Sequence, residues 1–205
     1  MAVVRALAAA LALLAAVPAA RAQDHDLSRE MIVADPAAPV AGNPKGDVTI
    51  VAFLDYNCPY CKSSAPALEK LVRADGRIRL VYKDWPILSE SSVYGAKLAL
   101  AAKRQGKYEE AHRALMALKG ASRPHADLDA AVAAAGVDMP RLLADAKASE
   151  AEIVTLLKRN DAQARGMGFP GTPVYLVGPK LVAAPLDYEG FKDAVAQARE
   201  RQKTR

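Results

Sequence analysis

Two short apolar runs, and the helical stretch between them, organise the first half of the chain. Val48–Leu54 (VTIVAFL) is apolar at nearly every position, which is typical of a strand covered on both faces. Apolar side chains recur at helical spacing over Pro59–Asp75, with a kink predicted at Pro66, and Gly76 ends the pattern. A second strand is predicted over 77–83 (RIRLVYK). The predicted order so far is strand, helix, strand.

The pattern changes after the second strand, where 89–165 is alanine-rich and follows a helical period. Breaks fall at Gly106, 120–124, Gly136 and Pro140, so four or five helices are expected. The last is predicted to begin at Ser149, whose hydroxyl would cap it while Glu152 bonds back. A block of about 77 residues is too long for a loop, which indicates a helical subdomain.

The last part of the chain returns to short strands. A loop is predicted over 166–173, followed by strands at Val174–Val177 and 181–184 that a Gly-Pro turn joins as a hairpin. Asp187 is a good N-cap for a final helix that runs to about Gln202. A parallel strand–helix–strand unit followed by a hairpin and a helix predicts an α/β sheet with helices on both faces.

The first residues have the pattern of an export signal rather than of a folded element. Arg5 precedes an uncharged apolar run over 6–17, and small residues up to Ala22 form a cleavage site. A membrane anchor is the alternative, but this run falls short of the ~20 apolar residues that a spanning helix needs. We therefore predict a signal peptide at 1–22, removal near Ala22, and a periplasmic protein. The segment 23–47 is polar and without period, and is predicted to be a lead-in.

Composition excludes several classes of protein. Apolar residues make up 52% of the 205 residues and charged residues 25%, which argues against a disordered chain. Alanine is the largest part of the apolar content, with 44 residues, and no internal stretch resembles a membrane span. Loss of Arg5 and Arg21 with the signal lowers the net charge from +5 to +3, and no basic run is interleaved with aromatic residues. One domain is expected, with no binding of nucleic acid.

The two cysteines lie three positions apart where the first strand passes into the helix. Cys58 stands at the helix start and Pro59 is the first helical residue, a favoured place for proline. The free N–H groups and the dipole of the first turn stabilise a negative sulfur, which lowers the pKa of such a cysteine to ~3.5–7.5. Cys61 is one turn deeper on the same face, where it can attack a mixed disulfide on Cys58. Pro59 and Tyr60 between the sulfurs tune the reduction potential.

Two other interpretations of the pair are weaker. A zinc site needs four ligands, and His25, His112 and His125 are far from the pair and lack ligand spacing. We therefore predict no metal and no cofactor. A purely structural disulfide would close a very small loop, which stabilises a fold little. A redox-active pair is the favoured interpretation.

The segment FLDYNCPYCK, followed about 110 residues later by GFPGTP, resembles the DsbA-like thiol–disulfide oxidoreductases of the thioredoxin superfamily. The resemblance extends roughly from Asn43 to the C-terminus. It implies a thioredoxin-like fold over 48–205, with a helical subdomain at about 89–165 inserted between the second and third core strands.

The resemblance also implies roles for individual residues. Cys58 would be the exposed attacking cysteine and Cys61 the buried resolving one. Thr172 and Pro173 would form the cis-proline loop beside the sulfurs, where Thr172 tunes the pair and its backbone binds a substrate strand. Gly171 would allow the close approach. Without the resemblance, a trans proline opening an edge strand is the better expectation.

One position departs from the pattern of these relatives. Many of them carry a buried acid six residues before the first cysteine, where this chain has Ala52. Such an acid assists proton transfer at the resolving thiol, so that route is in doubt here, and Asp55 is not at the matching position. Lys83, at the end of the second strand, could lie near the site. The favoured interpretation is that it is an exposed lysine at the end of the strand.

Aromatic and methionine side chains near the motifs are candidates for an apolar rim that holds unfolded substrate. The candidates are Tyr56, Tyr60, Trp85, Met167 and Phe169. A core position is an equal alternative for Trp85 and Phe169. For Tyr56 and Tyr60, which flank the cysteines, we expect the rim.

Three functions remain open at this point. The leading hypothesis is an exported oxidoreductase that introduces disulfides into reduced exported proteins and is reoxidised by a membrane redox partner. The second is a disulfide isomerase or reductase kept reduced, and such relatives are usually oligomers held by an N-terminal extension. Here 23–47 lacks a heptad pattern, so a monomer is expected. The third is a non-redox peptide-binding or chaperone protein.

Overall fold

The computed structural model describes residues 27–120 and 122–204. The predicted signal peptide at 1–22 lies outside this part of the chain. Within the described residues, five strands form one sheet in the order β1-β3-β2-β4-β5. The strands are β1 (Val40–Gly42), β2 (Val48–Leu54), β3 (Ile78–Asp84), β4 (Val174–Val177) and β5 (Lys180–Val182).

The two central strands are β2 and β3, which run parallel and are buried along almost their whole length. Their continuous apolar sequences suit this position, because helices cover both faces of the sheet. The β4 strand pairs antiparallel with β2, and β5 pairs antiparallel with β4. The predicted hairpin is thus present, although β5 ends earlier than the predicted range 181–184.

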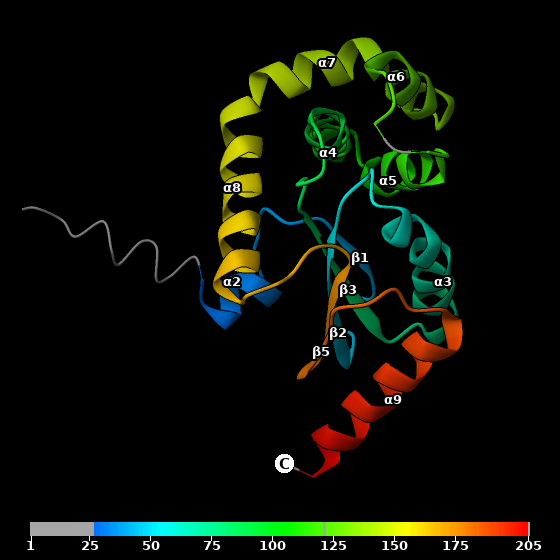
Figure 1. Ribbon diagram of the computed structural model, residues 1–205, viewed down its shortest axis with the longest axis vertical. Coiled ribbons are helices and arrows are strands. Elements are labelled where there is room, and N and C mark those ends of the chain that lie inside the picture. The colour runs from blue at the N-terminus through cyan, green and yellow to red at the C-terminus, as the bar shows by residue number, and fades with distance from the viewer. Residues whose placement is uncertain (1–26, 121, 205) are drawn as a thin grey trace, which may run out of the picture.

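Helix α3 (Pro59–Asp75) and helix α9 (Tyr188–Lys203) pack against each other on one side of the sheet (Figure 1). Gly76 ends α3 in the left-handed conformation with φ of 69°, which glycine adopts without the penalty of a Cβ atom. The Asp187 side chain accepts a bond of 2.8 Å from the Gly190 N–H and so caps α9 as predicted.

The helical subdomain follows β3 and returns the chain to β4, as expected for an insertion between the second and third core strands. Its described residues form five α-helices and one 3₁₀ turn. They are α4 (Glu90–Ala102), η1 (Lys103–Gln105), α5 (Tyr108–Ala117), α6 (His125–Ala134), α7 (Met139–Ala148) and α8 (Glu150–Gly166). Many of its alanines are buried between helices, so the small side chain allows their close approach.

The capping box predicted at Ser149 is wrong. Helix α7 ends at Ala148 and α8 begins at Glu150, so Ser149 is the single residue between two helices. Its hydroxyl turns back to donate to the Asp145 carbonyl at 2.6 Å and makes no cap bond to α8. A serine hydroxyl near a helix end often bonds a carbonyl of the preceding turn instead of capping the next helix, and Ser149 does so here.

The lead-in is more ordered than its polar sequence indicated. It contains the short helix α2 (Arg29–Val33) and strand β1. The carboxylate of Asp35 is buried, lies 3.0 Å from Lys83 Nζ, and accepts bonds of 2.9 and 3.0 Å from Arg159. Lys83 is therefore fully buried, and its interpretation as an exposed strand-end lysine is wrong. A buried carboxylate is retained only with such partners, so this cluster fixes the lead-in to the sheet.

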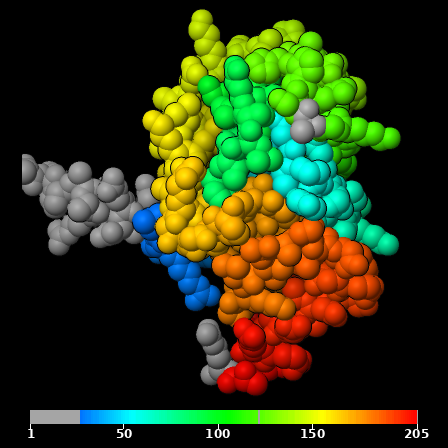
Figure 2. Space-filling model, in the orientation of Figure 1, coloured from blue at the N-terminus to red at the C-terminus, as the bar shows by residue number. Residues whose placement is uncertain are grey.

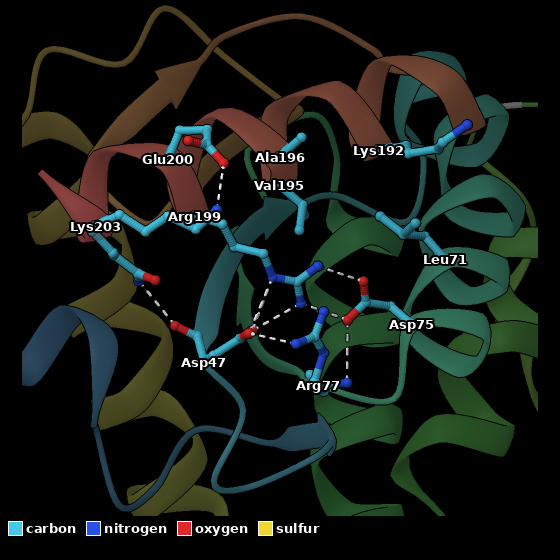
Figure 3. Close-up of a pocket in the computed structure, with 11 residues that line it drawn as sticks. Asp47, Leu71, Asp75, Arg77, Lys192, Val195, Ala196, Arg199, Glu200 and Lys203 are labelled. Atoms are coloured by element: carbon cyan, nitrogen blue, oxygen red, sulfur yellow. Dashed lines mark hydrogen bonds and ion pairs between the residues drawn. The ribbon is translucent and has the colours of Figure 1, made fainter.

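A second charge cluster holds the C-terminal helix (Figure 3). The guanidinium of Arg199 on α9 lies between two carboxylates, at 2.7 Å from Asp75 and 2.8 Å from Asp47. The hydrogen bond from Arg199 holds the pKa of each carboxyl below the usual 3.8. The start of β2, the end of α3 and the end of α9 are thereby joined at one edge of the fold.

We expect Arg199→Gln to reduce the free energy of unfolding by about 1–2 kcal/mol at pH 7, because both ion pairs are charge-assisted but partly exposed. Both carboxyls have depressed pKa values, so their contribution is present above pH 3.8 and is lost as the pH falls through the lower folded values. Urea unfolding at pH 7 and pH 3 measures this, with Arg201→Gln on the same helix as the control. An equal loss at both pH values would contradict the assignment.

Candidate active site

The two cysteines lie at the junction of β2 and α3. Cys58 is the N-cap of α3, and its Sγ accepts a hydrogen bond of 3.4 Å from the Cys61 N–H. Pro59 occupies the first turn, as the sequence predicted. Its missing N–H costs nothing there, because an N–H at this position would have no partner within the helix. The sulfur of Cys58 thus takes the position in which a side-chain oxygen usually caps a helix.

The two sulfurs differ in environment. Cys61 is completely buried, whereas Cys58 retains 3% of its surface. Cys58 is less exposed than the resemblance implied, although it is still the more accessible of the two. Both are free thiols in the structure.

The Thr172–Pro173 loop lies directly beside Cys58. The peptide bond between Thr172 and Pro173 is cis, and the Cys58 thiol donates to the Thr172 carbonyl at 3.2 Å. The buried Thr172 Oγ1 has no hydrogen-bond partner among the described residues, so this hydroxyl is available to a Cys58 thiolate. In Figure 2 the start of α3 (cyan) lies at the surface between the helical subdomain (green) and the segment that leads into β4 (orange).

These contacts separate the acidities of the two thiols. The pKa of Cys58 is lowered from 9.0 to about 6, by the bond with the Cys61 thiol first, and then by the Thr172 hydroxyl and the backbone N–H groups of Cys61 and Tyr60, which outweigh burial. Burial raises the pKa of Cys61 far above its usual value. At neutral pH, Cys58 is a thiolate and Cys61 keeps its proton. This is the arrangement of one reactive sulfur and one protected sulfur.

Sequence reasoning missed the part that Asp55 plays in the site. Its buried carboxylate accepts four hydrogen bonds, from the N–H groups of Asn57, Ile87 and Leu88 and from the Ser92 hydroxyl, at 2.7 to 3.0 Å. The side-chain amide of Asn57 also donates into the same group of serines at the start of α4. The turn before Cys58 is therefore tied to the start of the helical subdomain. The only sequence signal was an acid beside the motif.

A second buried polar cluster lies beneath the turn. The Asp84 carboxyl accepts bonds of 3.0 and 3.1 Å from the Tyr108 hydroxyl, and Tyr56 Oη lies 3.0 Å from His112 Nδ1. Burial raises the pKa of Asp84 to about 7 and lowers that of His112 to about 3. Tyr56 is 97% buried here (3% exposed), so the prediction that it belongs to a substrate-binding rim is wrong.

The exposed apolar surface near the cysteines is therefore different from the expected one. Tyr60 is 61% exposed, as expected, but Trp85 and Phe169 pack in the core against Phe53. Met167 is only partly buried. Ile87 and Leu88, at 37% and 53% exposed, were missed. The apolar run WPIL before a helix cap was their signal in the sequence.

The described residues contain no group of three or more His, Cys, Asp or Glu placed to hold a metal ion. Across 27–120 and 122–204, no helix is both long and apolar enough to cross a membrane.

Comparison with known proteins identifies the class. A family model described as Thioredoxin matches residues 34–197, so the chain belongs to the thioredoxin family. The fold, with its helical insertion, is the one that the resemblance implied.

Three solved structures are similar to this chain. A thioredoxin-like oxidoreductase from Silicibacter pomeroyi DSS-3 is 42% identical, with a TM-score of 0.78 over 84% of this chain and 98% of that one. The thiol–disulfide exchange protein α-DsbA2 from Wolbachia pipientis is 29% identical, with a TM-score of 0.76 over 88% and 98%. A periplasmic thioredoxin-like protein from Salmonella enterica serovar Typhimurium is 27% identical, with a TM-score of 0.71 over 82% and 94%.

The chain thus combines the thioredoxin-family fold with a cysteine pair, and two of the similar structures are described as an oxidoreductase and as a thiol–disulfide exchange protein. The curated relatives that its sequence matches are much longer. A Na⁺/H⁺ antiporter NhaA 1 from Salinispora arenicola is 30% identical over 164 residues, which is 78% of this chain and 24% of that protein. The chain thus spans about a quarter of the length of these relatives.

Replacing Asp84 with Asn tests the buried cluster. The folded protein holds the Asp84 proton up to about pH 7, whereas the unfolded chain releases it near 3.8. Stability therefore falls as the pH rises between these values, by up to about 1.4 kcal/mol per pH unit. Urea unfolding from pH 4 to pH 8 should show Asp84→Asn gaining stability relative to the unsubstituted protein as the pH rises. A difference that does not change with pH would exclude this role.

Proposed function

We propose that this chain is an exported thiol–disulfide oxidoreductase that introduces disulfides into reduced proteins in the periplasm. The observation that carries the proposal is the low pKa of Cys58 at the start of α3. A stable thiolate favours the reduced dithiol, and an enzyme whose reduced form is stable is a strong oxidant of other thiols.

The reaction needs two exchanges. A substrate thiolate attacks Cys58 Sγ of the Cys58–Cys61 disulfide, the bond between the two cysteines breaks, and Cys61 leaves and takes up a proton. A second substrate thiolate then attacks the substrate sulfur of this mixed disulfide and displaces Cys58 as a thiolate. Two electrons pass from substrate to enzyme. A membrane redox partner would remove them and restore the disulfide.

Neighbouring residues have supporting roles in the proposal. Pro59 and Tyr60 tune the pair, and Gly171, Thr172 and Pro173 form the loop against which the substrate backbone lies. The apolar contact that was expected of Tyr56 passes to Tyr60, Ile87 and Leu88, because these side chains reach the surface. The predicted signal and the similarity to a periplasmic thioredoxin-like protein support export.

A disulfide isomerase or reductase that is kept reduced is the alternative. The described part of the lead-in argues against an oligomerising stalk, because Asp35 binds it to Lys83 and Arg159 of the same chain. This supports a monomer. The steady-state redox state in the cell separates the two functions, since an oxidant is found mainly with the Cys58–Cys61 disulfide and an isomerase mainly with free thiols.

We expect Cys61→Ser to accumulate mixed disulfides with substrate proteins, because its Cys58 thiolate can attack a substrate disulfide and displace one substrate thiolate, and the Cys61 thiol that could then displace the substrate from Cys58 is missing. Non-reducing gels of the exported fraction should show adducts that reductant removes. Cys58→Ser is the matched control and should form none. If Cys61→Ser gives no adducts, or Cys58→Ser gives as many, the assigned order of attack is wrong.

A further inference from the structure

A groove beside the reactive cysteine has no part in the exchange described above. It lies between α3 and α5, which pack side by side (Figure 1), and has a volume of about 710 Å³. Pro59, the residue after Cys58, lines one end and Arg73 lines the other. The groove thus begins at the active site and leads away from it along α3.

The groove has the length of a short peptide. Its residues on α3 follow one face of the helix from Pro59 to Arg73, which at 1.5 Å per residue spans about 20 Å. An extended chain advances about 3.3 Å per residue, so the groove accommodates roughly six residues.

The lining is apolar near the centre. Ala65 and Pro66 contribute from α3, and Met116, Ala117 and Leu118 contribute from the end of α5. The unbranched Met116 side chain adapts to different apolar partners. This composition suits alternate apolar side chains of an extended peptide.

The charges on the groove are mostly positive. Lys62, Arg73, Arg113 and Lys119 line it, against the single carboxylate of Glu69. Glu69 lies at the far end, where it bonds Arg113 at 3.0 Å and Arg73 at 3.5 Å.

At the end of the groove near Cys58, no carboxylate that lines the groove balances the positive charges. The Lys62 ammonium donates to the carbonyls of Leu118 and Gly120, both at 2.7 Å, and forms no ion pair with a described carboxylate. Lys119 is exposed beside it. A carboxylate on a bound partner would therefore meet two cations at this end.

We propose that this groove binds an extended acidic and apolar segment of the substrate polypeptide, next to the cysteine that reacts with Cys58. The proposal rests on the proposed function. A substrate sulfur at Cys58 brings its neighbouring residues to Pro59, so entry into the groove becomes intramolecular and weak contacts suffice. Opposite charge also speeds the encounter.

Two reduced peptides of equal length test the groove. Each has one cysteine followed by six residues, alternating Glu and Leu in the first and Lys and Leu in the second. We expect the acidic peptide to reduce the oxidised protein about tenfold faster at low salt, with a smaller ratio at high salt. Quenched-flow separation of the products gives both rate constants.

Two variants alter the groove at exposed positions away from the sulfurs. Lys119→Glu reverses a charge and Ala117→Trp fills the space, and each should lower the ratio to about twofold or less. Lys70→Glu is the matched control for charge, because Lys70 lies on α3 outside the groove, 4.7 Å from the centre of the Tyr188 ring. It should keep the ratio of the unsubstituted protein.

The outcomes separate the two proposals. Equal rates for both peptides, or an unchanged ratio in both groove variants, would overturn the groove while leaving the oxidant intact. Failure of the oxidised protein to react even with a small neutral thiol would overturn the proposed function instead. If Ala117→Trp changes the mass in solution without changing the ratio, the groove holds a second copy of the chain and the proposal is wrong.

Discussion

The sulfur of Cys58 lies after the turn that joins a buried strand to a helix, in the place where a capping oxygen usually lies, and its chemistry follows from that position. The first N–H groups of α3 point at it, and the Thr172 loop closes the other side. Cys61 follows one turn later, inside the core, and so cannot share this stabilisation. The difference in acidity between the two sulfurs is thus a consequence of a strand, a turn and a helix in fixed order.

Several buried polar groups hold the turn that precedes Cys58. Asp55 organises the backbone of the turn and of the 87–88 segment at once, and the Asp84 cluster supports it from below. Both acidic side chains are buried among groups that donate hydrogen bonds to them. The donors come from the turn itself, from the 87–88 segment and from helices α4 and α5, so the helical subdomain is part of the site. It also provides one wall of the groove beside α3.

The sequence predicted the elements that depend on local patterns. The central strands, α3 with Pro59 and Gly76 at its ends, and the helical block all follow from apolar periodicity and turn residues. The cis peptide bond before Pro173 was predicted only from the family resemblance. The burial of Lys83 and Tyr56 could not be foreseen, because their partners Asp35 and His112 lie 48 and 56 residues away. The capping box predicted at Ser149 was wrong because Ser149 is the single residue between two helices, and its hydroxyl bonds the first of them.

The difference in acidity makes Cys58 a thiolate at neutral pH while Cys61 keeps its proton, and this can be measured directly. Absorbance at 240 nm of the reduced protein reports the thiolate. Subtracting the absorbance of the oxidised protein at the same pH removes the contribution of the tyrosines. A single step for one thiolate with a midpoint near pH 6, and no second step up to pH 9, is the predicted result. A midpoint near 9, or two thiolates formed together, would contradict it.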